Sequence, residues 1–248
     1  ISLVSVSKIP VFKQAANYPV INIVHKIPKE GTKKLVYFDA TTIESLETIM
    51  PSYELSELEL NALPRAIMPI NVRSKQLAIV TTLLRSAVNA RQFIKVQEGL
   101  RIPALWEKPQ TTSTDKPVIK QYQFNRYSPI KEVSFISESN CSLLGRSQRV
   151  MNCQKPKLIF AEDALRIEGT LDTSQGLCQG GVYFATLIDD KNLKLQYLLG
   201  LYNSRLLTFI FKCLYSGIHM GGGYLRFRTE YLEEMPIRHI DFSNPKDK

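Results

Sequence analysis

The stretch "YLLGLYNSRLLTFIFKCLYSGIHMGGGYLRFRTEYLEEMPI", residues 197–237, combines two kinds of sequence. Its first part belongs to an apolar run with helical spacing, and we expect one helix over residues 193–214 that packs against the core. Three glycines at 221–223 then end this run, because glycine is a poor helix former and permits turns. The pattern predicts a core helix that leads into an exposed, mobile loop.

The segment "YLRFR" (224–228) follows the glycines and alternates polar or aromatic with apolar side chains. Alternate residues of an extended chain share one face. Tyr224, Arg226 and Arg228 would therefore point one way, and Leu225 and Phe227 toward the core. An exposed hairpin beside a solvated edge is the simpler interpretation of the same residues.

Apolar runs at 1–6 and 18–24 predict buried strands near the start of the chain, and 35–38 predicts a further short strand. Residues 41–66 alternate acidic and apolar side chains and predict short helices or a polar connector. The chain starts with a strand-like run and lacks the pattern of a signal peptide. We therefore expect it to be a piece of a longer protein.

Residues 74–93 have apolar side chains at three- and four-residue steps and predict a helix with Ser74 as its N-cap. From Gly99 onward, short apolar runs broken by Pro, Gly, Asn and Ser predict strands. These strands include 157–160, 181–188 and a run around Phe135, while 109–117 predicts a surface loop. The expected fold class is therefore mixed α+β.

The net charge of +9 lies entirely in residues 71–248, which carry 25 basic and 16 acidic side chains, whereas residues 1–70 carry seven of each. Within 116–157 there are 8 basic residues and 2 acidic ones. A polyanion is the natural partner of such a surface, because neutralised phosphates release their counterions. An ordinary basic surface that maintains solubility is the alternative.

The four cysteines and three histidines are too scattered for a zinc site or a redox dithiol. We expect reduced thiols in a cytoplasmic protein and no metal. No apolar run is long enough to cross a bilayer, so no membrane partner is expected.

Known catalytic motifs are not visible. "QGLCQGG" (175–181) lacks the lysine and hydroxyl group of a phosphate-binding loop, and nothing marks a nucleophile elbow. Asp189-Asp190-Lys191 is compatible with one end of a metal nuclease site, but a turn from strand to helix explains it more simply. We therefore expect no catalytic residue in this chain.

Several strings, taken in order, resemble one family. "KIPVFKQAANYPVINIVHK" (8–26) resembles the last strands of the catalytic domain of restriction–modification N6-adenine DNA methyltransferases. "FIKVQEGLRIPALWE" (93–107) is similar to the opening of the target-recognition domain that follows, although Ile-Pro replaces the usual Thr-Gly pair there. Four later strings resemble the TaqI-like C-terminal specificity domain: "QKPKLIF" (154–160), "GGVYFATL" (180–187), "LQYLLGLYNSRLL" (195–207) and "YLEEMPI" (231–237).

The resemblance implies that residues 1–70 are the tail of a catalytic domain, the end of a Rossmann-like methyltransferase sheet with a connector. It implies a mixed α/β target-recognition domain over residues 71–248. The family's "NPPY" tetrapeptide and glycine-rich S-adenosylmethionine loop are missing from this sequence and would lie upstream, in a polypeptide that can also include a nuclease. The chain is then expected to bind double-stranded DNA, to hold no cofactor and to be inactive alone, S-adenosylmethionine being bound by the parent enzyme.

If the chain binds DNA, the face shared by Tyr224, Arg226 and Arg228 suggests that Arg226 reads a base and Arg228 holds a phosphate. The expected DNA-binding residues are Arg226, Arg228, Tyr224, His219, Arg146, Arg149, Arg126, Lys120, Ser174 and Gln175. Thr170 and Asp172 lie in the same predicted polar loop as Ser174 and Gln175 and are further candidates. Surface charge is the alternative for Arg146 and Arg149, and a structural role for Arg126.

Two functions of other classes remain open. The chain could be a protein-interaction module whose basic face binds an acidic partner. It could also be a small enzyme acting on nucleic acid through a site that has no familiar motif. Binding to duplex DNA that persists in the presence of heparin would distinguish DNA recognition from the protein-interaction module. Turnover by the isolated chain would support the small enzyme.

Overall fold

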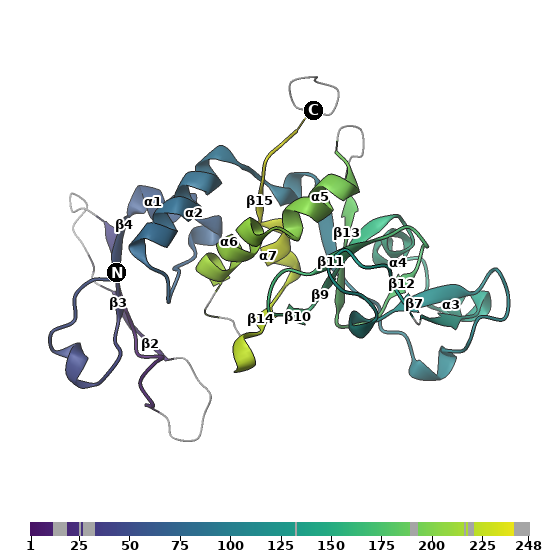
Figure 1. The fold of residues 1–248 in the computed structure, drawn as a ribbon, viewed down its shortest axis with the longest axis horizontal. Coiled ribbons are helices and arrows are strands. Elements are labelled where there is room, and N and C mark those ends of the chain that lie inside the picture. Colours follow the sequence, from purple (N-terminus) through teal and green to yellow (C-terminus); the bar gives the residue numbers. More distant parts are fainter. Residues whose placement is uncertain are drawn as a thin grey trace. The chain divides into compact units, whose positions relative to one another are not determined.

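The computed structural model describes residues 1–11, 19–24, 26, 33–131, 133–188, 193–215, 217 and 221–240. The chain divides into two compact units, one made of Ile1–Ala87 with Ile210–Gly223 and the other of Val88–Phe209 with Tyr224–Lys248. Both units contain helices and small sheets (Figure 1), which confirms the mixed α+β class. None of the described helices is long and apolar enough to cross a membrane.

The first unit is built on a four-stranded sheet of order β2–β1–β3–β4. Its strands are β1 (Ser2–Ser5), β2 (Val20–Ile23), β3 (Lys34–Asp39) and β4 (Tyr53–Ser56). Strand β1 runs parallel to β3, and the other two pairings are antiparallel. The predicted strands at the start of the chain are confirmed, but the predicted burial of the second is wrong, because β2 is an edge strand whose side chains are mostly exposed. Strand β4 is an additional strand within the predicted connector.

Two helices follow, α1 (Glu57–Ala62) and α2 (Ser74–Ser86). The prediction of one helix over 74–93 is wrong beyond Ser86, because Val88 and Asn89 form strand β5 and pair with β15 (Pro236–Ile237). The predicted N-cap is also wrong by one residue. Arg73 is the N-cap, and its backbone N–H donates to the side chain of Gln76 at 3.0 Å.

The second unit contains an antiparallel sheet of order β11–β9–β13–β6. Its strands are β6 (Ile94–Glu98), β9 (Lys157–Ala161), β11 (Gly169–Asp172) and β13 (Val182–Leu187). The predicted strands 157–160 and 181–188 are thereby confirmed. Helix α5 (Leu195–Tyr202) packs against β9 and β11 (Figure 1).

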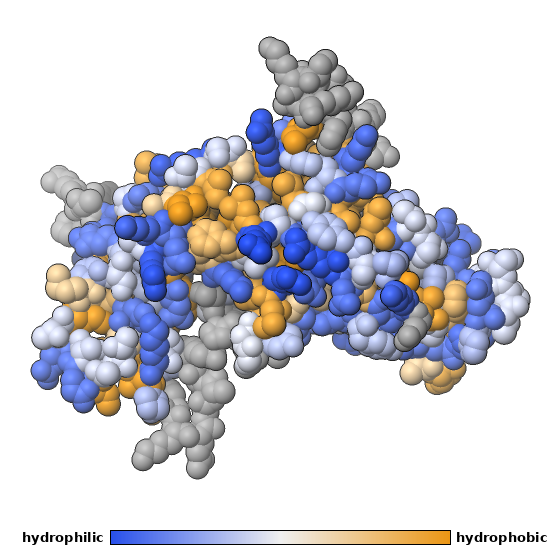
Figure 2. Space-filling view, in the orientation of Figure 1, coloured by the Kyte–Doolittle hydropathy of each residue, from blue (hydrophilic) through white to orange (hydrophobic). Residues whose placement is uncertain are grey.

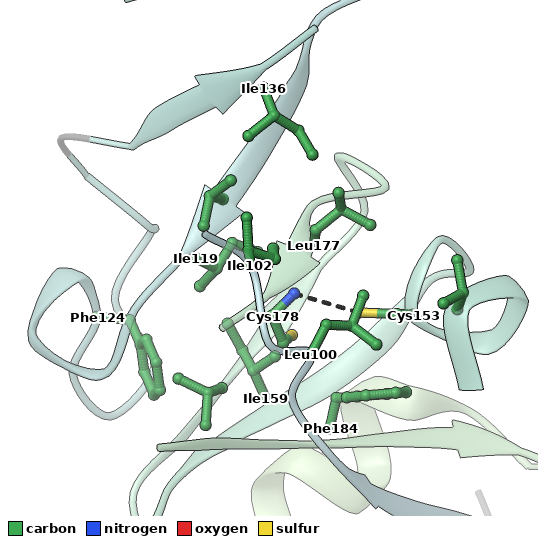
Figure 3. Close-up of a cluster of buried hydrophobic side chains, with 13 residues drawn as sticks. Leu100, Ile102, Ile119, Phe124, Ile136, Cys153, Ile159, Leu177, Cys178 and Phe184 are labelled. Atoms are coloured by element: carbon green, nitrogen blue, oxygen red, sulfur yellow. Dashed lines mark hydrogen bonds between the residues drawn. The ribbon is translucent and has the colours of Figure 1, made fainter. Parts of the chain in front are cut away.

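A smaller sheet of order β12–β7–β8 belongs to the same unit and shares a hydrophobic core with the larger sheet. It consists of β7 (Lys116–Ile119), β8 (Ser134–Ile136) and β12 (Leu177–Cys178), and is accompanied by α3 (Glu138–Leu143) and α4 (Gln148–Cys153). Figure 3 shows the hydrophobic cluster in which Ile119 and Ile136 join Ile159 and Phe184 of the larger sheet. The predicted strand around Phe135 is confirmed, and the predicted loop 109–117 ends inside β7.

All four cysteines are free thiols. Cys153 and Cys178 lie together in the hydrophobic cluster, where the backbone N–H of Cys178 donates to the Cys153 sulfur at 3.1 Å (Figure 3). These two thiols act as small core side chains. Six short 3₁₀ helices complete the described elements: η1 (Glu44–Leu46), η2 (Pro64–Ala66), η3 (Ala90–Gln92), η4 (Ala104–Trp106), η5 (Gln121–Gln123) and η7 (Gly221–Gly223).

The single helix predicted over 193–214 is instead two helices, α5 and α6 (Arg205–Tyr215). Asn203 lies between them and bonds to the backbone of Gly169, accepting from its N–H at 2.8 Å and donating to its carbonyl at 2.9 Å. The hydroxyl of Ser204 then accepts the N–H of Leu207 at 3.0 Å. These side-chain bonds replace helical ones and end one helix as the next begins.

The chain after the glycines forms short elements. Strand β14 (Leu225–Arg226) pairs antiparallel with β10 (Asp163–Ala164), and helix α7 (Thr229–Glu233) follows. Among the described residues the predicted loop is partly replaced by regular structure, since Gly221–Gly223 is a 3₁₀ turn and Arg226 belongs to a sheet, and its mobility stays a prediction. Two hydrogen-bonded strands are enough to fix the direction of the side chains that β14 presents.

Candidate nucleic-acid interface

The segment from Tyr224 to Arg228 alternates between exposed and buried side chains, as its sequence predicts. Leu225 and Phe227 are 4% and 1% exposed, whereas Tyr224 is 46% exposed. Arg226 and Arg228 are also exposed. Figure 2 shows strongly hydrophilic residues gathered near the centre of the view, where Figure 1 draws α7, the helix that follows the segment.

A cavity of about 270 Å³ lies beside this segment. It brings together side chains from β6, β13, β14, the end of β9 and the start of α7. Glu98, Glu162, Tyr183, Arg226, Arg228 and Glu230 line it. Five of these six residues carry charge, so the cavity offers both hydrogen-bond donors and acceptors to a ligand.

The strand register explains why these residues meet. Tyr183 on β13 lies directly opposite Glu98 on β6, so their side chains share one face. Glu162 follows β9, and its carbonyl accepts the backbone N–H of Phe227 at 2.8 Å. This bond continues the pairing of β10 with β14 by one further residue on each chain segment. It holds Glu162 beside Arg226.

Arg226 and Glu162 form an ion pair, with Nη2 of the arginine 2.9 Å from Oε1 of the glutamate. The side chains are 45% and 23% exposed, so the pair remains accessible. The hydrogen bond and the negative charge of Glu162 raise the pKa of Arg226. Within the described part of the chain, Arg228 makes no such ion pair.

Tyr183 has its pKa raised to about 12, mainly because it is buried and further because Glu162 and Glu98 are negatively charged. The positive charges of Arg226 and Arg228 oppose this rise. The phenol therefore stays protonated at neutral pH and serves as a neutral wall of the cavity.

Arg146 lies in the turn between α3 and α4, Arg149 lies in the first turn of α4, and neither is among the cavity residues. Both side chains are exposed. Ser147 between them caps α4 by accepting the N–H of Val150 at 3.4 Å. The two arginines are accessible to a ligand, and their role remains a prediction.

Lys120 and Arg126 already have partners inside the fold. Lys120 forms an ion pair with Glu107, and this hydrogen bond raises the lysine pKa. The Arg126 guanidinium lies 5.1 Å from the centroid of the Tyr127 ring. These contacts fit a structural role, and a part in DNA binding stays a prediction.

The predicted polar loop divides in two, because Thr170 and Asp172 belong to strand β11 and only Ser174 and Gln175 follow it. Ser174 and Gln175 are exposed, and the hydroxyl of Ser174 donates to Asp172 at 2.6 Å. Thr170 and Asp172 are 4% and 1% exposed, and Thr170 donates to the Ser128 carbonyl. The hypothesis that Thr170 and Asp172 touch bases is therefore wrong, because a ligand cannot reach them.

Two sequence predictions lie outside the described residues. One is the assignment of His219 to the DNA-binding set, and the other is the acidic turn Asp189-Asp190-Lys191. Among the residues that are described, no group of three or more His, Cys, Asp and Glu side chains could hold a metal ion.

Sequence reasoning missed Glu98, Glu162 and Tyr183. Glu98 ends strand β6, and Glu162 directly follows the fully buried β9. A charged residue at the end of a buried strand was the available signal, since such a residue is held rigidly and still reaches solvent. Nothing in the sequence links Glu162 to Arg226, which lies 64 residues further along the chain.

Comparison with known proteins gives one family. Residues 116–237 match the family described as the TaqI-like C-terminal specificity domain. The match includes the cavity's Glu162, Tyr183, Arg226, Arg228 and Glu230. No curated protein matches the chain.

Proposed function

Residues 116–237 form a TaqI-like C-terminal specificity domain, and from this premise we propose that the chain reads a specific sequence in double-stranded DNA. The observation that carries the proposal is the exposed set of Tyr224, Arg226 and Arg228, beside a cavity whose lining residues all lie in the matched region except Glu98. Arginine on a short strand can reach the major groove and bind guanine through two hydrogen bonds.

The charge of the chain supports the same proposal. The basic excess of residues 71–248 favours a polyanion as the partner. Such binding weakens as the salt concentration rises, because phosphate contacts release counterions. Charge alone gives no sequence preference. The ordered donors and acceptors of the cavity would supply that preference.

We propose that the reader serves an adenine-N6 DNA methyltransferase or a single-chain restriction–modification enzyme. Such an enzyme lifts its target base out of the duplex, which costs a few kcal/mol. A specificity domain that grips the flanking DNA offsets this cost and selects the site. In this proposal residues 1–70 complete a Rossmann-like sheet, to which the parallel pair β1 and β3 would belong.

The residues of the first unit do not fit a site for S-adenosylmethionine. Strands β1 and β3 are followed by "VSK" (6–8) and "ATT" (40–42), which contain no glycine for a tight turn around a cofactor. The glycines described in this unit, 217 and 221–223, follow a helix instead. We therefore assign the cofactor and the methyl transfer to the upstream part of the parent enzyme.

Selection from a duplex library with about 12 randomised base pairs tests the proposal. The 248-residue chain is immobilised, bound duplexes are amplified through several rounds, and the pool is sequenced. We expect one motif to be enriched at physiological salt. A pool that stays random while still binding at low salt would contradict sequence recognition and leave only a basic surface.

A further inference from the structure

We propose that Glu162 and Arg226 together read one G·C base pair, with Arg226 donating to guanine and Glu162 accepting from the cytosine of the same pair. The inference rests on the proposed DNA recognition and names the chemistry that it uses. It also assigns a binding role to Glu162, which has no part in the sequence-based predictions.

The geometry of the ion pair suits this task. An arginine has five N–H donors, and the bond to Glu162 engages Nη2 at 2.9 Å, so other donors of the guanidinium remain available. The Arg226 side chain is 45% exposed and can meet a ligand without unfolding β14. The pair therefore presents an ordered row of donors next to carboxylate acceptors.

A G·C pair carries the complementary row in the major groove. Guanine presents the acceptors O6 and N7, and the adjacent cytosine presents the N4 amino donor. With A·T, the adenine N6 amino group would face an arginine donor, and thymine O4 would face a carboxylate. Either contact leaves a polar group without a partner, which is costly in a desolvated interface.

The charge next to Arg226 favours a base edge over a phosphate. The Glu162 carboxylate lies 2.9 Å from this guanidinium, whereas Arg228 has no such ion pair among the described residues. A phosphate bound to Arg226 would be repelled by Glu162, whereas a neutral base edge would not. Repulsion of this kind also rejects unsuitable ligands and so adds to specificity.

The backbone holds Glu162 in position. Its N–H donates toward the carbonyl of Gly181 and the side chain of Gln121, each at 3.3 Å, and its carbonyl accepts from Phe227 at 2.8 Å. Gln121 in turn donates to the carbonyl of Asp163 at 2.8 Å. A reader fixed before binding loses little entropy when DNA arrives.

The test measures base preference at every position of the motif selected by the wild-type chain. Fluorescence anisotropy with single-base-pair variants of that duplex compares the wild type with Arg226→Lys, Arg226→Ala and Glu162→Gln. We expect one G·C position at which substitution costs the wild type about 10- to 100-fold in Kd. Each variant should reduce this penalty there and leave the preferences at other positions unchanged.

Arg226→Lys separates base reading from phosphate binding, because lysine keeps the charge but lacks the planar two-pronged donor. The matched control is Arg166→Ala, which removes the same charge from another exposed ion pair, with Glu168 at 3.2 Å. It should leave every base preference intact. Thermal unfolding of each variant checks that the exposed substitutions leave the fold unchanged.

The inference is overturned if Arg226→Lys binds as the wild type does and Arg226→Ala weakens all duplexes equally, since Arg226 would then hold a phosphate. It is also overturned if Glu162→Gln changes no preference, or if the motif has no fixed G·C position. In these cases the proposed DNA recognition still stands. If the wild type selects no motif at all, the proposed function fails and the inference fails with it.

Discussion

Lys157 is a charged residue in the interior of the second unit. Its side chain and that of Asp172 are 0% and 1% exposed, and the ammonium group donates to Asp172 and to the carbonyl of Gly176 at 2.7 Å. A buried charge is tolerated only when it is paired and hydrogen-bonded. The pair ties β9 to the turn that carries Ser174 and Gln175, so it positions an exposed loop from within.

We predict that Lys157→Met destabilises the chain by about 3–5 kcal/mol, because Asp172 is left as an uncompensated buried charge. Urea unfolding followed by circular dichroism measures the loss. The double variant Lys157→Met/Asp172→Leu removes both charges and should recover most of it. A single variant within about 1 kcal/mol of the wild type would show that the pair contributes little.

Arg228 differs from Arg226, because within the described residues it has no ion pair and is free to reach a phosphate. We predict that Arg228→Ala weakens binding by the same factor on selected and random duplexes. The slope of log K against log salt should become shallower by about one unit. Titrations between 50 and 200 mM salt measure this slope, because phosphate contacts change the affinity strongly over that range. Arg166→Ala is the control. A loss limited to one base position would assign base reading to Arg228 as well.

At the scale of elements, Asn203 separates α5 from α6 and joins the break to β11. It is 2% exposed, and its amide satisfies both backbone groups of Gly169. We predict that Asn203→Ala costs about 1–3 kcal/mol, because the Gly169 N–H loses its partner in the interior, whereas the Gly169 carbonyl keeps the N–H of Tyr127 at 3.0 Å. Urea unfolding would measure this. The exposed Asn61→Ala is the matched control and should change stability by less than about 0.5 kcal/mol.

The strands were predictable because buried strands are short apolar runs, as in "KLIFA" (157–161) and "VYFATL" (182–187). The helix ends were not. The break at Asn203 depends on Gly169, which is 34 residues away, and the end of α2 depends on the pairing of Val88 with Ile237. Local periodicity carries no information on such contacts, and tertiary pairing overrides helix propensity.

The candidate site divides in the same way. The exposed face of Tyr224, Arg226 and Arg228 follows from alternation alone, which is a local property. The Glu162 partner of Arg226 does not follow from it, because antiparallel pairing of β10 with β14 brings the two together. Sequence reasoning therefore found the guanidinium groups and missed the carboxylates that surround them.

Strand β2 is the edge of the first unit's sheet and carries exposed apolar side chains. Ile21 and Ile23 are 48% and 43% exposed, and the adjacent Val24 is 71% exposed. An apolar edge strand is a surface that pairs readily with further chain. We predict that β2 amides exchange hydrogen early in the isolated chain, well before those of β13. Equal protection of the two strands would contradict the proposal that this sheet belongs to a larger one.

At the scale of the whole molecule, we propose that the second unit recognises DNA and that the chemistry lies in residues outside this chain. The specificity domain, the basic excess and the cavity beside β14 all support recognition. The two rival functions make different demands. A basic protein-interaction module would bind any polyanion alike, and a complete small enzyme would show turnover by itself.

Competition by heparin tests the central claim most directly, because heparin competes for basic side chains without presenting a base sequence. The labelled duplex selected by the chain and a scrambled duplex of equal composition are each titrated with heparin at physiological salt. We predict that the scrambled duplex is released first and that the selected duplex resists at least about tenfold more heparin, since base contacts add 1–3 kcal/mol each. Release of both duplexes at the same heparin concentration would contradict sequence recognition.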